Sequence, residues 1–178
     1  MRIAILSDIH DHIPNLRTAL SRLQGVEALI CCGDLCSPFI INELAAGFQG
    51  AIHIVFGNND GDRYRITLNA LSRRDTIQVH RESASLLLGG KRIFVHHFND
   101  MGRLVAAAGE HDVVCYGHNH DYELKRDREG AALQINPGTI MGWHPRKGDV
   151  PATYALYDTA TGQAAIYDLE GKAIQVIR

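Results

Sequence analysis

The sequence predicts an α/β protein with mixed sheets, and two observations carry this prediction. Short β-branched runs alternate with segments whose apolar residues recur at helical spacing, which is typical of βαβ units with strands buried on both faces. After residue 122 the pattern changes to strands joined by Gly-containing turns without helical segments between them, which indicates added antiparallel strands. We expect one domain over residues 1–178.

Five strands are expected before the change of pattern, at residues 2–6, 28–32, 51–56, 92–95 and 112–116. A helix should begin at Pro14 and end at Gly25, because proline is favoured in the first turn of a helix and glycine just past its end. Apolar spacing predicts further helices around residues 40–45 and 104–108. The remaining strands are expected in residues 122–136 and 152–178 as a meander or hairpin set.

Composition limits the class of protein. A content of 46% hydrophobic residues is enough for an ordinary core, and no run approaches the roughly 18 apolar residues of a membrane span. The amino terminus is charged too early for a secretory signal, and the four cysteines include no C-x-x-C pair, so we expect a cytoplasmic protein with reduced thiols. The net charge of −2 gives no basic surface for extended nucleic acid, whereas a small phosphorylated substrate or a homo-oligomer is compatible with the sequence.

Residues of the metal-ligand type follow each of these five strands. The segments are SDIHDH, GDLC, GNND, HHFND and GHNH. Ligands bind outside the carboxyl ends of strands in open α/β sheets, so five such ends can converge on one place. One histidine pair alone, as in DVVCYGHNHD, could equally face solvent or accept hydrogen bonds, but that explanation does not cover five strand ends.

The donor types predict the chemistry of this place. Carboxylate, carboxamide and imidazole groups without a thiolate suit Mn, Fe, Zn, Co or Ni. At least seven candidate ligands exceed the need of one ion, so we expect two ions that share a carboxylate. Such a pair polarises a phosphoryl oxygen and lowers the pKa of a bound water, which predicts hydrolysis at phosphorus by a metal-bound water or hydroxide.

Local spacing supports a compact site. Asp8 and His10 are two residues apart in an extended segment and can therefore point to the same side. Gly33, Gly57 and Gly117 each precede a candidate ligand, which suits tight turns with close backbone approach.

The order Asp-x-His, Gly-Asp, Gly-Asn-x-Asp, a histidine after a strand and Gly-His-x-His resembles the calcineurin-like metallophosphoesterases. The short chain and the INPGT segment are similar to the small bacterial and archaeal phosphodiesterase branch of that family. The resemblance implies a four-layer α/β/β/α sandwich with a binuclear metal centre. It assigns one ion to Asp8, His10 and His120, the other to Asn58, His96 and His118, and a bridging role to Asp34.

Three places depart from the family pattern, and one of them is the segment GTIMGWHPRKGD, which only loosely resembles the family's Gly-Ser and Pro-Arg-Gly loop. Asn59 stands where many members carry a histidine that can protonate the leaving group, and an amide cannot act as an acid at neutral pH. A good leaving group, a metal-bound water or His12 could take over this role. The usual His-Gly-His is here His96-His97-Phe98, so that His97 either contacts phosphate or faces solvent.

Other polar residues receive secondary interpretations. Asp60 either holds a ligand in place or caps the helix expected near Asp62, and we favour the cap. Arg146 could reach a phosphate but is better explained as an exposed loop residue. Asn119 is expected to be a spacer between the two histidines of GHNH.

The predicted function is hydrolysis of phosphodiesters with the help of two divalent ions, Mn first among them, with catalytic roles for Asp34, Asn58, His97 and His12. The absence of the family histidine favours acidic leaving groups and hence diesters over monoesters, and phosphomonoester hydrolysis is the alternative activity. A protein-binding scaffold of the same fold, similar to a retromer coat subunit, is the alternative outside enzymes. That scaffold lacks part of the ligand set, whereas all seven positions are filled here.

Overall fold

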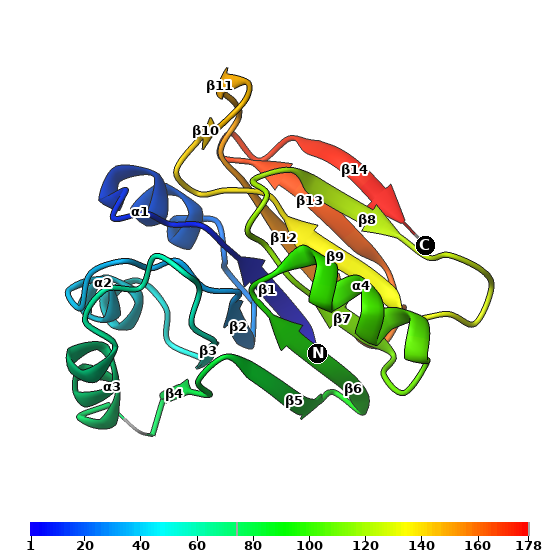
Figure 1. Ribbon diagram of the computed structural model, residues 1–178, viewed down its shortest axis with the longest axis horizontal. Coiled ribbons are helices and arrows are strands. Elements are labelled where there is room, and N and C mark those ends of the chain that lie inside the picture. Colours follow the sequence, from blue (N-terminus) through cyan, green and yellow to red (C-terminus); the bar gives the residue numbers. More distant parts are fainter. Residues whose placement is uncertain (74, 178) are drawn as a thin grey trace.

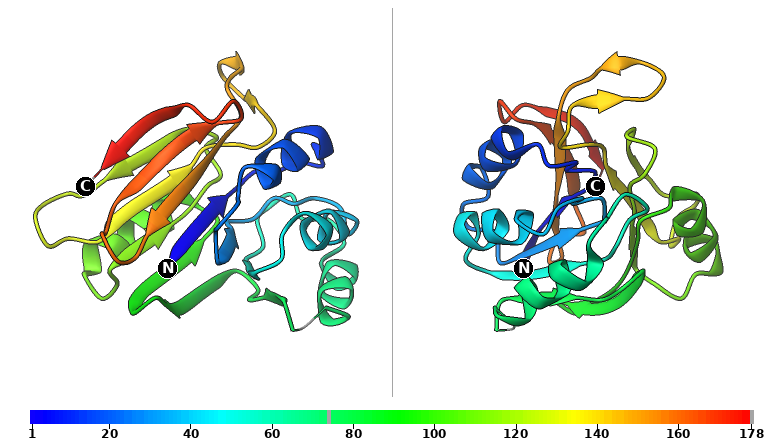
Figure 2. Two further views of the ribbon diagram at one scale, coloured as in Figure 1. Left: turned by 180° about the vertical axis from the view of Figure 1, so that it is seen from behind. Right: turned by 60° about the vertical axis from the view of Figure 1, so that its left-hand side comes forward.

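Two β-sheets packed face to face and four helices form four layers in the computed structural model, which describes residues 1–73 and 75–177 (Figure 1). Three helices cover the outer face of the larger sheet, and the fourth covers the outer face of the smaller sheet (Figure 2). This arrangement confirms the predicted α/β/β/α sandwich with mixed sheets.

The larger sheet has the strand order β14-β13-β12-β1-β2-β3-β4. Its first four strands in the sequence run parallel, and β12 joins them antiparallel to β1, with Ile5 opposite Ala155. The strands are β1 (Arg2–Leu6), β2 (Ala28–Cys31), β3 (Ala51–Ile54), β4 (Ile77–Val79), β12 (Thr153–Asp158), β13 (Ala164–Asp168) and β14 (Ala173–Ile177).

The smaller sheet has the order β5-β6-β7-β9-β8, with three parallel strands in the middle and an antiparallel strand at each edge. Its strands are β5 (Ser83–Leu88), β6 (Lys91–His96), β7 (Val113–Cys115), β8 (Tyr122–Lys125) and β9 (Leu133–Pro137). The predicted antiparallel set is therefore correct for β12 to β14 and for β8 with β9. It is incomplete because β9 also pairs in parallel with β7. A small hairpin of β10 (Trp143–His144) and β11 (Gly148–Asp149) projects beyond both sheets (Figure 2).

The helices are α1 (Ile13–Ser21), α2 (Ile40–Gly47), α3 (Arg63–Leu71) and α4 (Asn99–Ala108). As predicted, Pro14 lies in the first turn of α1, but this helix ends before Gly25, which occupies the following turn with a φ of +72°. None of the helices in the described residues has the length and apolar character of a membrane span.

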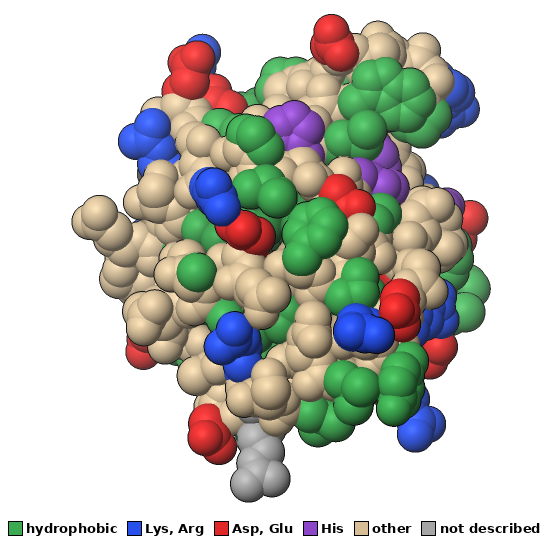
Figure 3. Space-filling view, turned by 90° about the vertical axis from the view of Figure 1, so that its left-hand side faces the viewer, with side chains coloured by type: hydrophobic (Ala, Val, Ile, Leu, Met, Phe, Trp, Pro, Cys, Tyr) green, Lys and Arg blue, Asp and Glu red, His purple; other side chains and the backbone are tan. Residues whose placement is uncertain are grey.

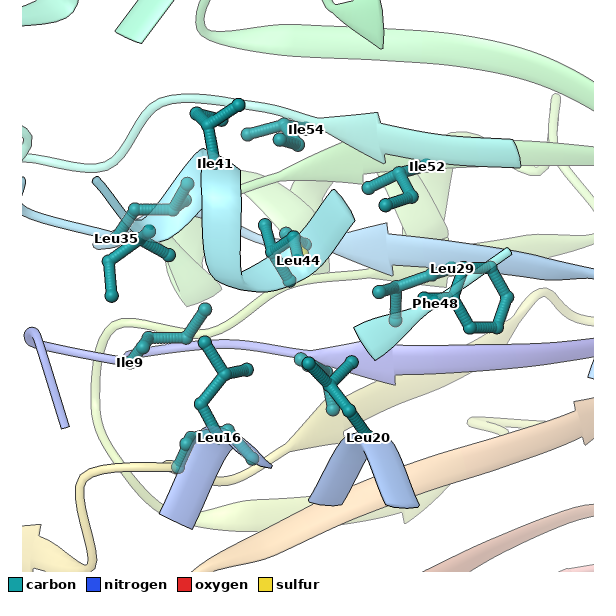
Figure 4. Close-up of a cluster of buried hydrophobic side chains, with 14 of the residues drawn as sticks. Ile9, Leu16, Leu20, Leu29, Leu35, Ile41, Leu44, Phe48, Ile52 and Ile54 are labelled. Carbon is teal, nitrogen blue, oxygen red and sulfur yellow. The ribbon is translucent and has the colours of Figure 1, made fainter. Parts of the chain in front are cut away.

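Apolar side chains fill the spaces between the layers. Leu16 and Leu20 of α1 and Leu44 of α2 pack on Leu29 and Ile52 of the larger sheet (Figure 4). A second cluster joins the two sheets and includes Ile5, Ile30, Val95, Val113 and Ile135. Because both sheets are anchored in this shared core, their strands present their carboxyl ends in fixed positions.

Candidate metal centre

Loops at the carboxyl ends of five strands supply the candidate ligands. They follow β1, β2, β3, β6 and β7, and they bring together Asp8, His10, Asp34, Asn58, His97, His118 and His120. Most of these side chains are buried, and histidines reach the surface among hydrophobic side chains on the face seen in Figure 3. The convergence expected from the strand ends is thus present.

A first group of possible ligand atoms comes from Asp8, His10 and His120, and these atoms lie within 4.8 Å of one another. The Asp8 Oδ1 atom is 3.7 Å from His10 Nε2 and 3.3 Å from His120 Nε2. The two Nε2 atoms are 3.2 Å apart. A carboxylate and two imidazoles at this spacing match the donors that divalent transition metals prefer.

A second group shares Asp8 and adds Asp34 and His97. The Nε2 atom of His97 is 3.4 Å from Asp34 Oδ2, 3.0 Å from Asn58 Oδ1 and 3.2 Å from His118 Nδ1. Four residues from four loops, with carboxylate, carboxamide and imidazole donors, therefore meet at this point.

The residues of both groups fit a bound cation. Asp8 Oδ1 is buried and has no hydrogen-bond partner among the described residues. His120 donates from Nδ1 to the Trp143 carbonyl at 2.5 Å, and His97 donates from Nδ1 to the Cys32 carbonyl at 2.8 Å. In the neutral rings these bonds place the proton on Nδ1 and leave the Nε2 lone pair directed at the group, as in metal-binding histidines.

The carboxylates of the centre are held in their charged form. Burial alone would raise the pKa of Asp8, yet the adjacent His10 and His120 imidazoles bring it far below its ordinary value. Burial likewise opposes the ionisation of Asp34, and contacts with His97 and Asn59 lower the pKa of that carboxyl. Ionised carboxylates are the form that binds metal ions.

The backbone of the ligand loops is strained. Positive φ angles occur at eight non-glycine residues of the described chain, and five of them are the candidate ligands Asp8, His10, Asp34, His118 and His120. Such conformations are costly for residues with a side chain and persist where the surrounding structure enforces them, which is common at functional sites. The strain allows short loops to aim several side chains at one point.

Two glycines allow the loops to approach one another. A Cβ atom on Gly57 would lie 2.1 Å from Asp34 Oδ1, and one on Gly117 would lie 1.9 Å from Ser7 Oγ. No side chain fits at either position, in agreement with the close approach expected from the sequence.

The structure separates the two adjacent histidines of HHFND. The His96 ring stacks on Phe94 with 6.3 Å between centroids, and its Nδ1 atom accepts a hydrogen bond from the Phe98 amide. Ile93 and Val95 point into the core between the sheets, so His97 follows them on that side and His96 points away. His97 therefore replaces His96 in the candidate ligand set, and the interpretation of His97 as a solvent-facing residue is wrong because its side chain is fully buried.

Asp60 and Asn119 fasten the ligand loops. Asp60 accepts hydrogen bonds from the amides of Gly57 at 2.7 Å, Cys36 at 2.9 Å and Asp34 at 3.2 Å. The helix cap favoured for it is wrong, because Asp62 caps α3. Asn119 is more than a spacer, since its Oδ1 accepts from Asn136 of INPGT at 2.7 Å.

Two further residues make contacts at the centre that were not predicted from the sequence. Cys36 places its sulfur 3.4 Å from His10 Nδ1. Asn59 donates from its backbone and from its side chain to the two oxygens of Asp34, both at 2.8 Å. A carboxamide one residue after a candidate ligand is a usable signal for Asn59, whereas the contact of Cys36 depends on the fold.

His12 lies at the rim and outside both ligand groups. It is the N-cap of α1, where its Nδ1 accepts a hydrogen bond from the Asn15 amide at 3.2 Å, and its ring lines an adjacent pocket. Arg146 is exposed, as expected.

Comparison with known proteins identifies the family. The calcineurin-like phosphoesterase superfamily domain matches residues 1–162. The chain belongs to this superfamily. This membership confirms the resemblance seen in the sequence and the enzyme class that it implied, a metal-dependent phosphoric ester hydrolase.

Several relatives lie within this superfamily fold. The chain is 34% identical over 149 residues to phosphodiesterase MJ0936 of Methanocaldococcus jannaschii, which covers 80% of this chain and 86% of that protein. A solved structure described as a novel archaeal phosphodiesterase superposes with a TM-score of 0.84 at 28% identity, covering 94% of this chain and 99% of the other. Vacuolar protein sorting 29 from Cryptosporidium parvum shares the fold, with a TM-score of 0.71 at 20% identity over 99% of this chain and 95% of its own.

Proposed function

We propose that this member of the superfamily is a phosphodiesterase that depends on two divalent metal ions. The observation that carries the proposal is the position of Asp34. Its Oδ2 atom is 3.5 Å from His10 Nε2 in the first group and 3.4 Å from His97 Nε2 in the second. One carboxylate oxygen that reaches an imidazole of each group supports two neighbouring ions that share Asp34.

In this proposal the first ion is held by Asp8, His10 and His120, and the second by Asn58, His97 and His118. The oxygen and nitrogen donors suit Mn first, with Ni, Co, Zn and Fe as alternatives. Such ions, when bound, polarise a phosphoryl oxygen and lower the pKa of a water molecule. The chain itself keeps Asp8 and Asp34 ionised and fixes His97 and His120 through backbone carbonyls, so the donors are oriented before an ion arrives.

Two observations support diesters over monoesters. The relative with 34% identity is named a phosphodiesterase. In addition, the amide of Asn59 is engaged with Asp34 and supplies no acid, which favours esters whose leaving groups need little protonation. We assign Asn59 to positioning Asp34.

His12 is our proposed donor to the ester oxygen. Its Nδ1 accepts from the Asn15 amide, so the proton of the neutral ring resides on Nε2. The ring lines the pocket next to the ligand group, where a hydrogen bond from Nε2 could stabilise a departing oxygen. A cytoplasmic location is also proposed, with support from the four free cysteines.

The protein-binding scaffold receives less support. Vacuolar protein sorting 29 shares the fold with this chain, but at 20% identity that likeness concerns the fold alone. A pure scaffold would have no reason to keep buried, strained ligand loops with an unpaired carboxylate oxygen on Asp8.

The test is to measure bound metal in the purified protein and then assay an aryl phosphodiester and the matching aryl monoester with Mn²⁺ and with chelator. We expect two ions per chain, faster diester than monoester hydrolysis, and loss of activity with chelator. No uptake of Mn, Ni, Co or Zn would contradict the proposal and favour the scaffold. If the monoester is hydrolysed faster than the diester, the proposed metal centre stands but the proposed preference for diesters is wrong.

A further inference from the structure

A pocket of about 800 Å³ opens beside the ligand group. It is formed by the start of α1, the β10–β11 hairpin and the turn between β13 and β14, which lie at the same end of the molecule (Figure 1). The volume is in the range of small-molecule sites, which span roughly 300 to 1,000 Å³.

Two residues that line this pocket form hydrogen bonds with residues of the first ligand group. The Trp143 carbonyl accepts the hydrogen bond from His120 Nδ1, and the Met141 amide donates to the Asp8 carbonyl at 3.0 Å. Both Trp143 and Met141 line the pocket. A phosphoryl group at the ligand group would therefore have its substituents within reach of this pocket.

The lining is apolar on one side. Met141, Trp143, Pro151 and Leu169 contribute to it, and the Trp143 side chain is 40% exposed although indole rings are usually covered. An exposed indole beside a concave apolar wall offers a face on which a planar ring can stack.

The charged residues that line the pocket are all acidic. Asp149, Asp168 and Glu170 line it, and no lysine or arginine does so among the described residues. Asp168 is partly engaged, because its carboxylate accepts a hydrogen bond from the Lys172 amide at 2.8 Å, whereas Asp149 and Glu170 are exposed. Such a lining attracts cations and repels anions.

We propose that this pocket binds one ester substituent of the substrate, and that this substituent is an aromatic group that is neutral or positively charged but not negatively charged. The proposal rests on the phosphodiesterase function given above. It predicts discrimination against substituents with further phosphates or carboxylates, because these would face Asp149 and Glu170 without a cationic partner in the lining.

The test measures binding by calorimetry to the Mn²⁺-loaded protein, with phosphonates that carry different groups. Methylphosphonate reports the metal centre alone, and phenylphosphonate adds a neutral ring. Phenylphosphonates with a carboxylate or a trimethylammonium group at the para position add charge. We expect the dissociation constant of phenylphosphonate to be about tenfold below that of methylphosphonate. The carboxylate compound should bind about tenfold more weakly than the trimethylammonium compound.

Variants separate the two features of the lining. Trp143→Ala should abolish the advantage of phenylphosphonate over methylphosphonate, and Trp143→Phe should restore most of it. Leu104→Ala, which removes an exposed apolar side chain on α4, is the matched control and should leave the advantage intact. Asp149→Asn combined with Glu170→Gln should narrow the difference between the two charged compounds, whereas the exposed Glu110→Gln should not.

The outcomes distinguish this proposal from the function on which it rests. Failure of methylphosphonate to bind the metal-loaded protein would overturn the metal centre and the pocket proposal together. Normal binding of methylphosphonate without any gain for phenylphosphonate, or a gain that survives in Trp143→Ala, would overturn the pocket proposal alone.

Discussion

The apolar residues of strand β1 and Asp8 in the loop that follows it are equally buried but obey different physical rules. In β1, Ile3 to Leu6 are at most 1% exposed, apolar and in regular extended conformation, so their burial stabilises the fold. Two residues later Asp8 is 0% exposed, charged and in a left-handed conformation with a φ of 52°. Burial of a charge and a positive φ both cost free energy.

This contrast shows how stability and function are divided. Burial of the apolar strand residues stabilises the fold. The loops reduce this stability, because they hold buried charges and strained backbone that direct several donor atoms at one point. Substitutions in the loops should therefore lower activity with little effect on stability. Substitutions in the strands should lower stability with little effect on activity.

The largest effect is expected for Asp34→Ala. Removal of the carboxylate that reaches both groups should lower phosphodiester hydrolysis by roughly a thousandfold or more and abolish binding of two ions. Thermal unfolding of the metal-free variant should change little, because the cost of burying the Asp34 charge is removed together with the two hydrogen bonds that Asn59 donates to it. A variant with near-normal rates would show that Asp34 does not bridge.

Leu29→Ala should show the reverse profile. Leu29 is fully buried in β2 beneath α1 and α2, and truncation leaves a cavity that costs about 2–5 kcal/mol of unfolding free energy. Urea denaturation measures this change. Metal content and rate per folded molecule should stay close to those of the original protein, and a loss of bound metal in the folded variant would contradict the division between the regions.

His53 is a polar residue inside strand β3, and it therefore tests whether burial of a polar group in a strand also costs stability. Burial and the neighbouring His80 lower the pKa of His53 to about 4 from an ordinary value of 6.5. His53 thus binds a proton more weakly in the folded state than in the unfolded state. The free energy of unfolding is therefore not reduced by this group above pH 6.5, and it falls as the pH drops from 6.5 toward 4. The loss attributable to this group is about 3 kcal/mol at most.

Unfolding of the original protein and His53→Gln between pH 4 and 7 isolates this contribution. The difference in unfolding free energy between the two proteins should change over this interval, because the variant lacks the group that titrates. Parallel curves would show that His53 is protonated equally well in both states.

The smallest effect is expected at Cys36, whose sulfur lies 3.4 Å from His10 Nδ1. Cys36→Ala should weaken binding of one ion by roughly tenfold, since the partner that orients a metal-binding histidine tunes its affinity. Cys36→Ser keeps a polar atom there and should lose less. Titration with Mn²⁺ compares them, and equal affinity in all three proteins would exclude an orienting role.

Much of the fold and the general position of the site followed from the sequence. Buried parallel strands have β-branched runs, and their carboxyl ends carry the polar residues of a site, so Asp8, Asp34 and His118 could be recognised along the chain. The early end of α1 and the parallel return of β9 beside β7 depend on tertiary packing.

The choice between adjacent histidines shows where sequence reasoning stopped. Family order pointed to His96, but the alternation of Ile93 and Val95 into the core places His97 at the ligand group. That alternation was present in the sequence and could have decided the question. The contacts of Asp60 with the amides of Cys36 and Asp34 could not be foreseen, because they join loops that are separated by 24 to 26 residues.

The most direct test of the account compares bound metal in His96→Ala and His97→Ala, measured by elemental analysis after dialysis against limiting Mn²⁺. We predict two ions per chain in His96→Ala, as in the original protein, and at most one in His97→Ala, because only His97 meets Asp34, Asn58 and His118. Full occupancy in His97→Ala with loss of an ion in His96→Ala would contradict the centre described here.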